Sequence, residues 1–156
     1  MSIVYENIIS ILKKLSISYK EWDHEAVFTS EDAARIRGRQ DASEGAKALL
    51  FKTKESEFVL VVIPADEKAD TKKIKQLHGT KDLRLASPEE VLEVTGVKIG
   101  CVTPFGLKND VRTYVKKTVF DIDTVFLNPG LHTKTLCIKG VDLKKVMQKE
   151  HVIEFD

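Results

Sequence analysis

The chain has 156 residues, a length that suits one domain able to close a hydrophobic core without metal or disulfide support. Its apolar fraction of 42% and charged fraction of 31% are those of an ordinary soluble protein. The 25 basic and 24 acidic residues leave a net charge of +1, which gives no argument for nucleic-acid binding through overall charge. We therefore expect a single domain over residues 1–156, with any such binding confined to a local patch.

No run approaches the roughly 20 apolar residues of a membrane-spanning helix, and the N-terminus lacks the basic and apolar regions of a signal peptide. We therefore expect a cytoplasmic protein with no membrane partner. The two cysteines, Cys101 and Cys137, are far apart in sequence, and neither belongs to a CxxC motif. This pattern is typical of reduced, structural thiols.

The first half of the chain mixes helical and β-like patterns. Helices are marked by apolar residues at helical spacing and by a capping residue, and strands by runs rich in β-branched and aromatic residues. The predicted elements are, in chain order, a helix over 7–15, a strand over 19–22, a helix from the cap residue Ser30 to Gly38, and strands over 46–53 and 58–63.

The second half holds the best-marked helix, which begins SPEE, with Ser87 as cap, Pro88 in the first turn and Glu90 in the capping-box position. Its elements are a helix from Asp70 to Gly79, a helix from Ser87 to Gly96, strands over 111–115, 124–127 and 135–138, and a helix starting near Asp142. Because the last three strands follow one another without a helix, we predict an α+β domain with a mixed, largely antiparallel sheet.

Lys47 is placed inside an otherwise small and apolar run, EGAKALLFK, at 44–52. In a strand it shares a face with Leu49 and Phe51, so neither face of the strand is typical of open solvent. An ammonium on an apolar wall costs several kcal/mol unless a negative group meets it. Two partners are open, an internal carboxylate such as Glu44 and a bound ligand.

The segment KIGCVTPFGLKND, at 98–110, is glycine-rich and lies between a predicted helix and a predicted strand. It lacks the Gly-Lys-Ser/Thr ending of a phosphate loop and the GxGxxG spacing of a dinucleotide site. Gly100 and Gly106 allow the backbone to approach a ligand or a neighbouring strand closely, and Pro104 stiffens the loop. A plain structural turn explains the same pattern.

Neither the histidines nor the cysteines show the spacing of a metal site, and no GxSxG motif is present. We therefore expect no metal and no cofactor. The histidines are His24, His78, His132 and His151. His132 follows an NPG turn whose Pro129 and Gly130 suit the two central positions of a type II turn, so it is either a site residue or a half-exposed histidine beside a hairpin.

Five segments follow one another in an order and spacing that cover nearly the whole chain. They are HEAVFTSEDAA at 24–34, EGAKALLFK at 44–52, FVLVVIPADEKADTKKIKQLHG at 58–79, LASPEEVLEVTGVKIGCVTPFGL at 85–107 and VFLNPGLHTKTLCIKG at 125–140. Together they resemble the YbaK and prolyl-tRNA-synthetase-associated editing domain, found in freestanding aminoacyl-tRNA deacylases of the YbaK and ProX types.

The resemblance implies a curved, mixed sheet, partly closed like a barrel and flanked by helices. It also implies one cleft, formed by the lysine of the AK(A/T)L strand, the GxxxPFG loop and a glycine-containing turn near the end of the domain. In this chain the corresponding residues are Lys47, Gly100, Pro104, Phe105, Gly106, Gly130 and His132.

The family reaction is hydrolysis of the ester between a wrong amino acid and the terminal adenosine of a tRNA. By the resemblance, Lys47 is the electrostatic anchor, the loop from Gly100 to Gly106 orients the terminal nucleotide, and His24, Thr29 and His132 are candidates for the amino-acid pocket. No protein nucleophile is assigned, because the ester is already activated and the neighbouring ribose hydroxyl helps to orient water. The expected substrate carries a small noncognate amino acid such as Ala, Ser, Thr or Cys, on the proline tRNA or a related one.

The expected partners are the acceptor end of an aminoacyl-tRNA and, as a second candidate, a separate aminoacyl-tRNA synthetase. Two basic segments, 68–76 and 108–117, are candidates for phosphate contacts, although solvated faces explain them equally well. Two rival functions remain. One is a noncatalytic module that holds tRNA ends or docks on a synthetase, and the other is a different small-molecule hydrolase or binder on the same fold.

Overall fold

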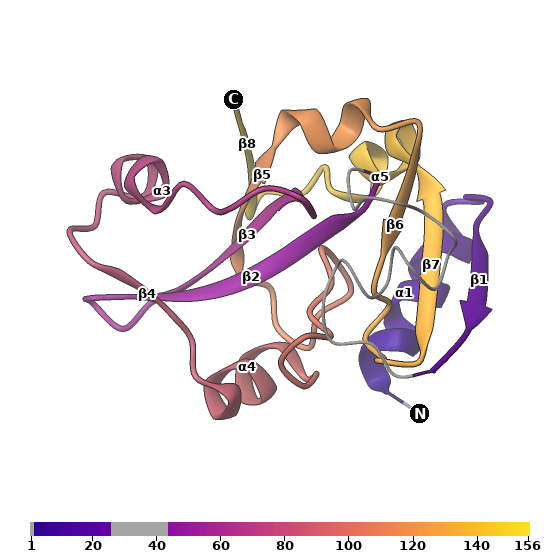
Figure 1. Ribbon diagram of the computed structural model, residues 1–156, viewed down its shortest axis with the longest axis horizontal. Coiled ribbons are helices and arrows are strands. Elements are labelled where there is room, and N and C mark those ends of the chain that lie inside the picture. The colour runs from indigo at the N-terminus through magenta and orange to yellow at the C-terminus, as the bar shows by residue number, and fades with distance from the viewer. Residues whose placement is uncertain (1, 26–43) are drawn as a thin grey trace.

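The computed structural model describes residues 2–25 and 44–156, whose strands form two sheets (Figure 1). The three-stranded sheet is antiparallel, with the order β1 (Lys20–Asp23), β7 (Lys134–Lys139), β6 (Thr124–Leu127). The five-stranded sheet has the order β4 (Leu83–Leu85), β2 (Ala46–Thr53), β3 (Phe58–Pro64), β5 (Arg112–Lys116), β8 (Val152–Phe155). Since β5 pairs in parallel with both β3 and β8, this sheet is mixed, and the predicted α+β class is confirmed.

The helices in the described part of the chain are α1 (Ile3–Lys14), α3 (Thr71–His78), α4 (Pro88–Thr95), α5 (Gly140–Val146) and the short 3₁₀ helix η1 (Lys117–Asp121). Two predicted caps are confirmed. Asp70 accepts a hydrogen bond from the Lys73 amide at the start of α3, and Ser87 and Glu90 form a reciprocal capping box on α4. The predicted helix capped by Ser30 lies outside the described residues.

The alternation predicted for β2 is confirmed by the way its two faces are buried. Ala46, Ala48 and Leu50 face the main hydrophobic core, which α1 and α5 complete. The opposite face contributes Phe51 to a second cluster. The other buried members of this cluster are Val59, Val61, Ile63, Ile74, Tyr114 and Phe155. Lys47 belongs to this second face by alternation, and it pairs in register with Ile63.

The two sheets are joined by a parallel bridge between Gly45 and Phe126, where the Phe126 amide donates to the Glu44 carbonyl at 2.9 Å. The described strands do not close into a barrel. The partly closed barrel therefore stays a prediction. No helix among the described residues is long and apolar enough to cross a membrane.

Candidate functional site

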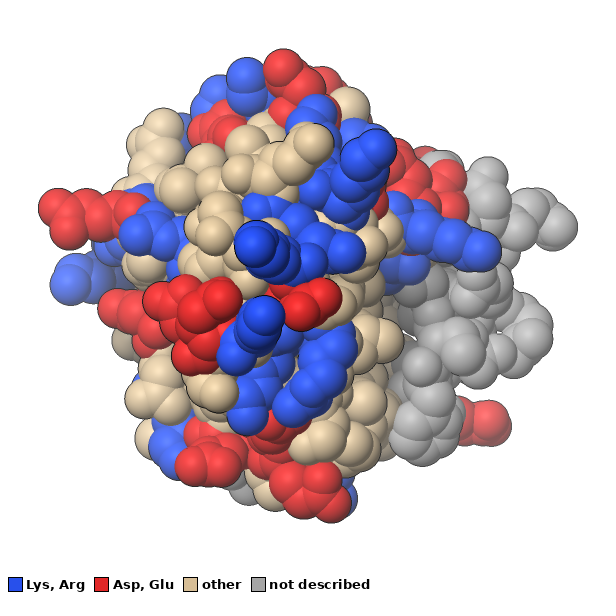
Figure 2. Space-filling model, turned by 90° about the vertical axis from the view of Figure 1, so that its left-hand side faces the viewer, with Lys and Arg blue, Asp and Glu red and all other residues tan. Residues whose placement is uncertain are grey.

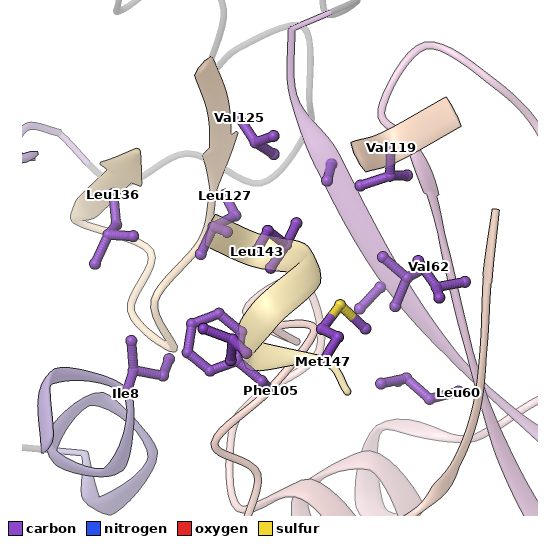
Figure 3. Packing of buried hydrophobic residues seen from close by; sticks show 14 of the residues in the cluster. Ile8, Leu60, Val62, Phe105, Val119, Val125, Leu127, Leu136, Leu143 and Met147 are labelled. Carbon is purple, nitrogen blue, oxygen red and sulfur yellow. The ribbon is translucent and has the colours of Figure 1, made fainter. Parts of the chain in front are cut away.

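The loop from Gly100 to Gly106 is fixed to the body of the protein at its PFG end. The Phe105 side chain is buried in the main core, between Ile8 of α1 and the helix that carries Leu143 (Figure 3). The Asn7 side-chain nitrogen Nδ2 donates to the Gly106 carbonyl at 3.0 Å. Phe105 was predicted to contact substrate, but its ring faces the core, so we assign it the role of anchoring the loop.

The segment after β6 has one feature of the turn that the sequence predicted. Gly130 has φ +95°, as the third position of a type II turn requires. The Asn128 side-chain oxygen accepts hydrogen bonds from the amides of Gly130 at 2.7 Å and Leu131 at 2.9 Å, which fixes the turn. Sequence reasoning missed Asn128, although Asn before Pro-Gly is a known turn signal.

The loop and the turn meet through Gly100 and His132. A Cβ added at Gly100 would lie 3.0 Å from His132 Cε1, so the imidazole fits against a position that has no side chain. Gly100 also has φ +87°, which favours glycine. The structure thus brings together two of the segments that the resemblance implies to form one cleft.

His24 follows β1 and lies at the end of the three-stranded sheet where the chain turns from β6 to β7. Its backbone amide donates to the Thr133 carbonyl at 2.9 Å. Its Nδ1 lies 2.6 Å from the Glu25 carbonyl oxygen and its Nε2 lies 2.7 Å from Thr135 Oγ1. Because a carbonyl only accepts, Nδ1 carries the hydrogen, and in the neutral ring Nε2 accepts from the Thr135 hydroxyl. Thr29, the remaining pocket candidate, lies outside the described residues.

Thr135 is a site residue that the sequence did not reveal, because its partner is 111 positions away. A Thr135→Val variant keeps the shape of the side chain but removes the hydroxyl, and we expect it to lower the free energy of unfolding by about 1 kcal/mol. Thr135→Ser, which keeps the hydroxyl, is the control in urea denaturation. If Thr135→Val were as stable as the unchanged protein, the hydrogen bond between Thr135 and His24 would contribute nothing to stability.

The half-buried Lys47 has no ion pair or hydrogen bond to its ammonium within residues 2–25 and 44–156. The internal pair with Glu44, one of the two alternatives raised by the sequence, is thus not formed. By contrast Lys52, five positions further along the same strand, donates to Glu90 Oε2 at 2.8 Å. The other alternative for Lys47, a bound ligand, stays a prediction.

Strand register shows where Lys47 lies relative to His24 and to the turn at 128–131. The Gly45–Phe126 bridge puts Lys47 on the same face as Phe126, and pairing through β7 extends that face to Thr135. Because β2 runs parallel to β6 at the bridge, Lys47 is displaced from it toward the turn at 128–131. No hydrogen bond or ion pair in the described structure joins Lys47 to the loop at 100–106.

The cysteines do not supply a nucleophile. Cys101 is 2% exposed, and burial raises the pKa of its thiol to about 11, so the thiolate is scarce at neutral pH. Cys137 is buried in β7. Both results confirm the structural interpretation of the thiols. Among the residues whose positions are described, no group of three or more His, Cys, Asp or Glu side chains could hold a metal ion.

Acidic neighbours partly neutralise the second of the two basic segments. Lys116 pairs with Glu67 at 2.6 Å and Lys117 with Asp156 at 3.3 Å, so part of the segment 108–117 is neutralised locally. Figure 2 shows the face that carries α3, where Lys and Arg side chains are interspersed with Asp and Glu. In Figure 1, α3 lies at the opposite end of the molecule from β1 and β7. These observations favour solvated faces over phosphate contacts beside the site.

Comparison with known proteins gives the family. Residues 24–146 match the family model described as the aminoacyl-tRNA editing domain. The multifunctional Ser/Thr-tRNA deacylase ProXp-y of Escherichia coli (strain K12) is 30% identical over 155 residues, which cover 97% of this chain and 92% of that protein. The chain therefore belongs to the aminoacyl-tRNA editing domain family, as its motifs predicted.

Two further relatives extend over most of the chain. The prolyl-tRNA editing protein ProX of Acetoanaerobium sticklandii is 26% identical over 145 residues, covering 90% of this chain and 88% of that protein. A crystal structure described as a candidate trans-editing enzyme for prolyl-tRNA synthetase has a TM-score of 0.81 at 23% identity, covering 99% of this chain and 97% of that one. This second likeness supports the fold.

Proposed function

We propose that this protein is a trans-editing hydrolase that cleaves the ester between a small, wrongly attached amino acid and the terminal adenosine of a tRNA. The observation that carries the proposal is the half-buried Lys47 ammonium, which has no partner in the described structure and lies on the face leading to His24 and the turn. The family match and the deacylase relative, similar along 97% of the chain, support the same reaction.

Lys47 acts on the charge that develops during hydrolysis. Attack of water on the ester carbonyl moves an electron pair onto the carbonyl oxygen, and the ribose oxygen then leaves and takes up a proton. A fixed ammonium in a poorly solvated position stabilises this oxyanion more than the neutral ester. The protein supplies no nucleophile; the neighbouring ribose hydroxyl orients the attacking water.

The other site residues hold the substrate. The backbone of the loop at Gly100 contacts the terminal nucleotide, Phe105 and Gly106 keep that loop against α1 and the core, and Pro104 stiffens it. His24 and His132 form walls of the amino-acid pocket, with Thr29 as a further candidate. In this arrangement His24 is held at both ring nitrogens, so it serves as a fixed wall.

The proposed substrates carry Ala, Ser, Thr or Cys on the proline tRNA or a related tRNA. Support comes from the names of two relatives, a Ser/Thr-tRNA deacylase and a prolyl-tRNA editing protein. A separate aminoacyl-tRNA synthetase is the proposed second partner, supported by the name of the structural neighbour.

A panel of misacylated tRNAs tests the proposal. Alanyl, seryl, threonyl and cysteinyl esters are prepared on the proline tRNA and on the tRNA cognate to each amino acid, and their hydrolysis is followed with and without the protein. We expect at least one ester to be released much faster than in buffer, and the correctly charged prolyl-tRNA to be spared. If every ester decayed at the buffer rate while tRNA still bound, the noncatalytic binding module would replace the hydrolase.

A further inference from the structure

Trp22, the chain's one tryptophan, lies on the edge strand β1, whose four residues are all exposed. It is 43% exposed and belongs to neither hydrophobic cluster. Its ring centroid lies 5.7 Å from that of Phe126, with the two planes tilted by 30°. Phe126 is 7% exposed, so the indole rests on a buried ring and keeps a large part of its own surface open to solvent.

Strand pairing explains how the two aromatic rings meet. Trp22 pairs with Thr135, and Phe126 pairs with Cys137 two residues along the same strand. These four residues therefore share one face, and the rings approach each other across β7. The contact holds the indole in place. The exposed part of the indole adds nothing to the core, and it leaves an aromatic face on which a ligand can stack.

The position of Trp22 relative to Lys47 suits one particular ligand. Both residues lie on the face that the Gly45–Phe126 bridge makes continuous, and β6 and β7 separate their strands. Three strand spacings give a separation of roughly 14 Å between the two positions. In an aminoacyl-adenosine the ester and the base lie on opposite sides of the ribose, so an ester held at Lys47 leaves the base free to extend toward Trp22.

We propose that Trp22, braced by Phe126, is the stacking platform for the terminal adenine of the tRNA acceptor end. The inference rests on the proposed function only in taking tRNA as the ligand. Stacking on an aromatic side chain suits an unpaired base, because every base offers a π face, and it needs no hydrogen-bond donors from the protein. The platform holds the base, while Lys47 acts on the ester.

Tryptophan fluorescence, excited selectively over the tyrosines, tests this directly, since Trp22 is the one tryptophan of the chain. The protein is titrated with uncharged proline tRNA and, in parallel, with the same tRNA lacking its terminal adenosine. We expect saturable quenching by the intact tRNA and much weaker quenching by the shortened one. Equal quenching by the two tRNAs, or none by the intact tRNA, would overturn the proposal without any mutation.

Variants then measure the contribution of the ring through the affinity for each tRNA, followed by filter binding. Trp22→Leu is expected to weaken binding of the intact tRNA by roughly five- to a hundredfold and to leave the shortened tRNA unaffected, whereas Trp22→Phe keeps most of the affinity. Leu85→Ala is the matched control, because Leu85 is 60% exposed on β4, in the other sheet. Thermal melts show whether each variant is folded.

The two proposals fail separately. Suppose that the protein deacylates tRNA, but Trp22→Leu and the unchanged protein bind the intact tRNA with equal affinity. The stacking platform would then be wrong and the hydrolase would stand. If quenching of Trp22 fluorescence depended on the terminal adenosine but no ester were hydrolysed, the stacking platform would stand and the hydrolase would be wrong.

Discussion

Replacing Lys47 with alanine is expected to leave the fold intact and to slow deacylation by roughly ten- to a thousandfold. The fold survives because the change removes a half-buried charge that has no ion-pair partner in the described structure. The rate falls because one electrostatic contact to the developing oxyanion is lost. Lys47→Arg should also be slow, since a planar guanidinium does not replace a compact ammonium in a closely fitted site.

Lys52→Ala is a matched control on the same strand, because Lys52 is also half-buried but is paired with Glu90. This variant should keep its deacylation rate, and Glu90 retains its second partner, Arg84. Single-turnover deacylation and thermal melting are measured on all three variants. An unchanged rate in Lys47→Ala, or a loss explained entirely by unfolding, would show that Lys47 does not act on the substrate.

Gly140→Ala is expected to be strongly destabilising. A Cβ at this buried position would overlap the Ile122 carbonyl oxygen and lie 2.6 Å from that of Phe120. Both obstacles are backbone atoms around η1, so no side chain can rotate away, and the start of α5 would have to separate from η1. We expect a loss of at least about 3 kcal/mol in the free energy of unfolding, measured by urea denaturation.

Gly79→Ala separates steric overlap from backbone strain. Gly79 ends α3 with φ +79°, and a Cβ there would meet nothing within 4 Å. Its substitution should therefore cost only the strain of a left-handed residue, about 1–2 kcal/mol. If the two variants were equally stable, the close approach of α5 and η1 at Gly140 would not be a constraint on the fold.

Local sequence signals predicted the parts of the fold that depend on neighbours in the chain. The capping box at Ser87 and the alternation of β2 both follow from residues within a few positions, and both are confirmed. β4 and β8 were missed because they are three and four residues long and carry mainly exposed or half-exposed side chains. Their identity as strands comes from pairing with β2 and β5, which no local pattern encodes.

The candidate site was predictable where a residue conflicted with its surroundings. Lys47 was found because a charge in an apolar run needs an explanation, and Gly130 because its turn has a strict backbone requirement. Thr135 and Trp22 gave no such conflict, since threonine and tryptophan are ordinary strand residues. Their roles depend on His24 and Phe126, which reach them only through the pairing of β1, β6 and β7.

The bridge between Gly45 and Phe126 has a thermodynamic consequence. Lys47 belongs to the five-stranded sheet, whereas Trp22 and the turn at 128–131 belong to or follow strands of the three-stranded sheet. A ligand that contacts both sides adds a cross-link between the sheets. Its binding free energy would then also oppose their separation, so binding of the proposed acceptor end is expected to stabilise the folded protein as a whole.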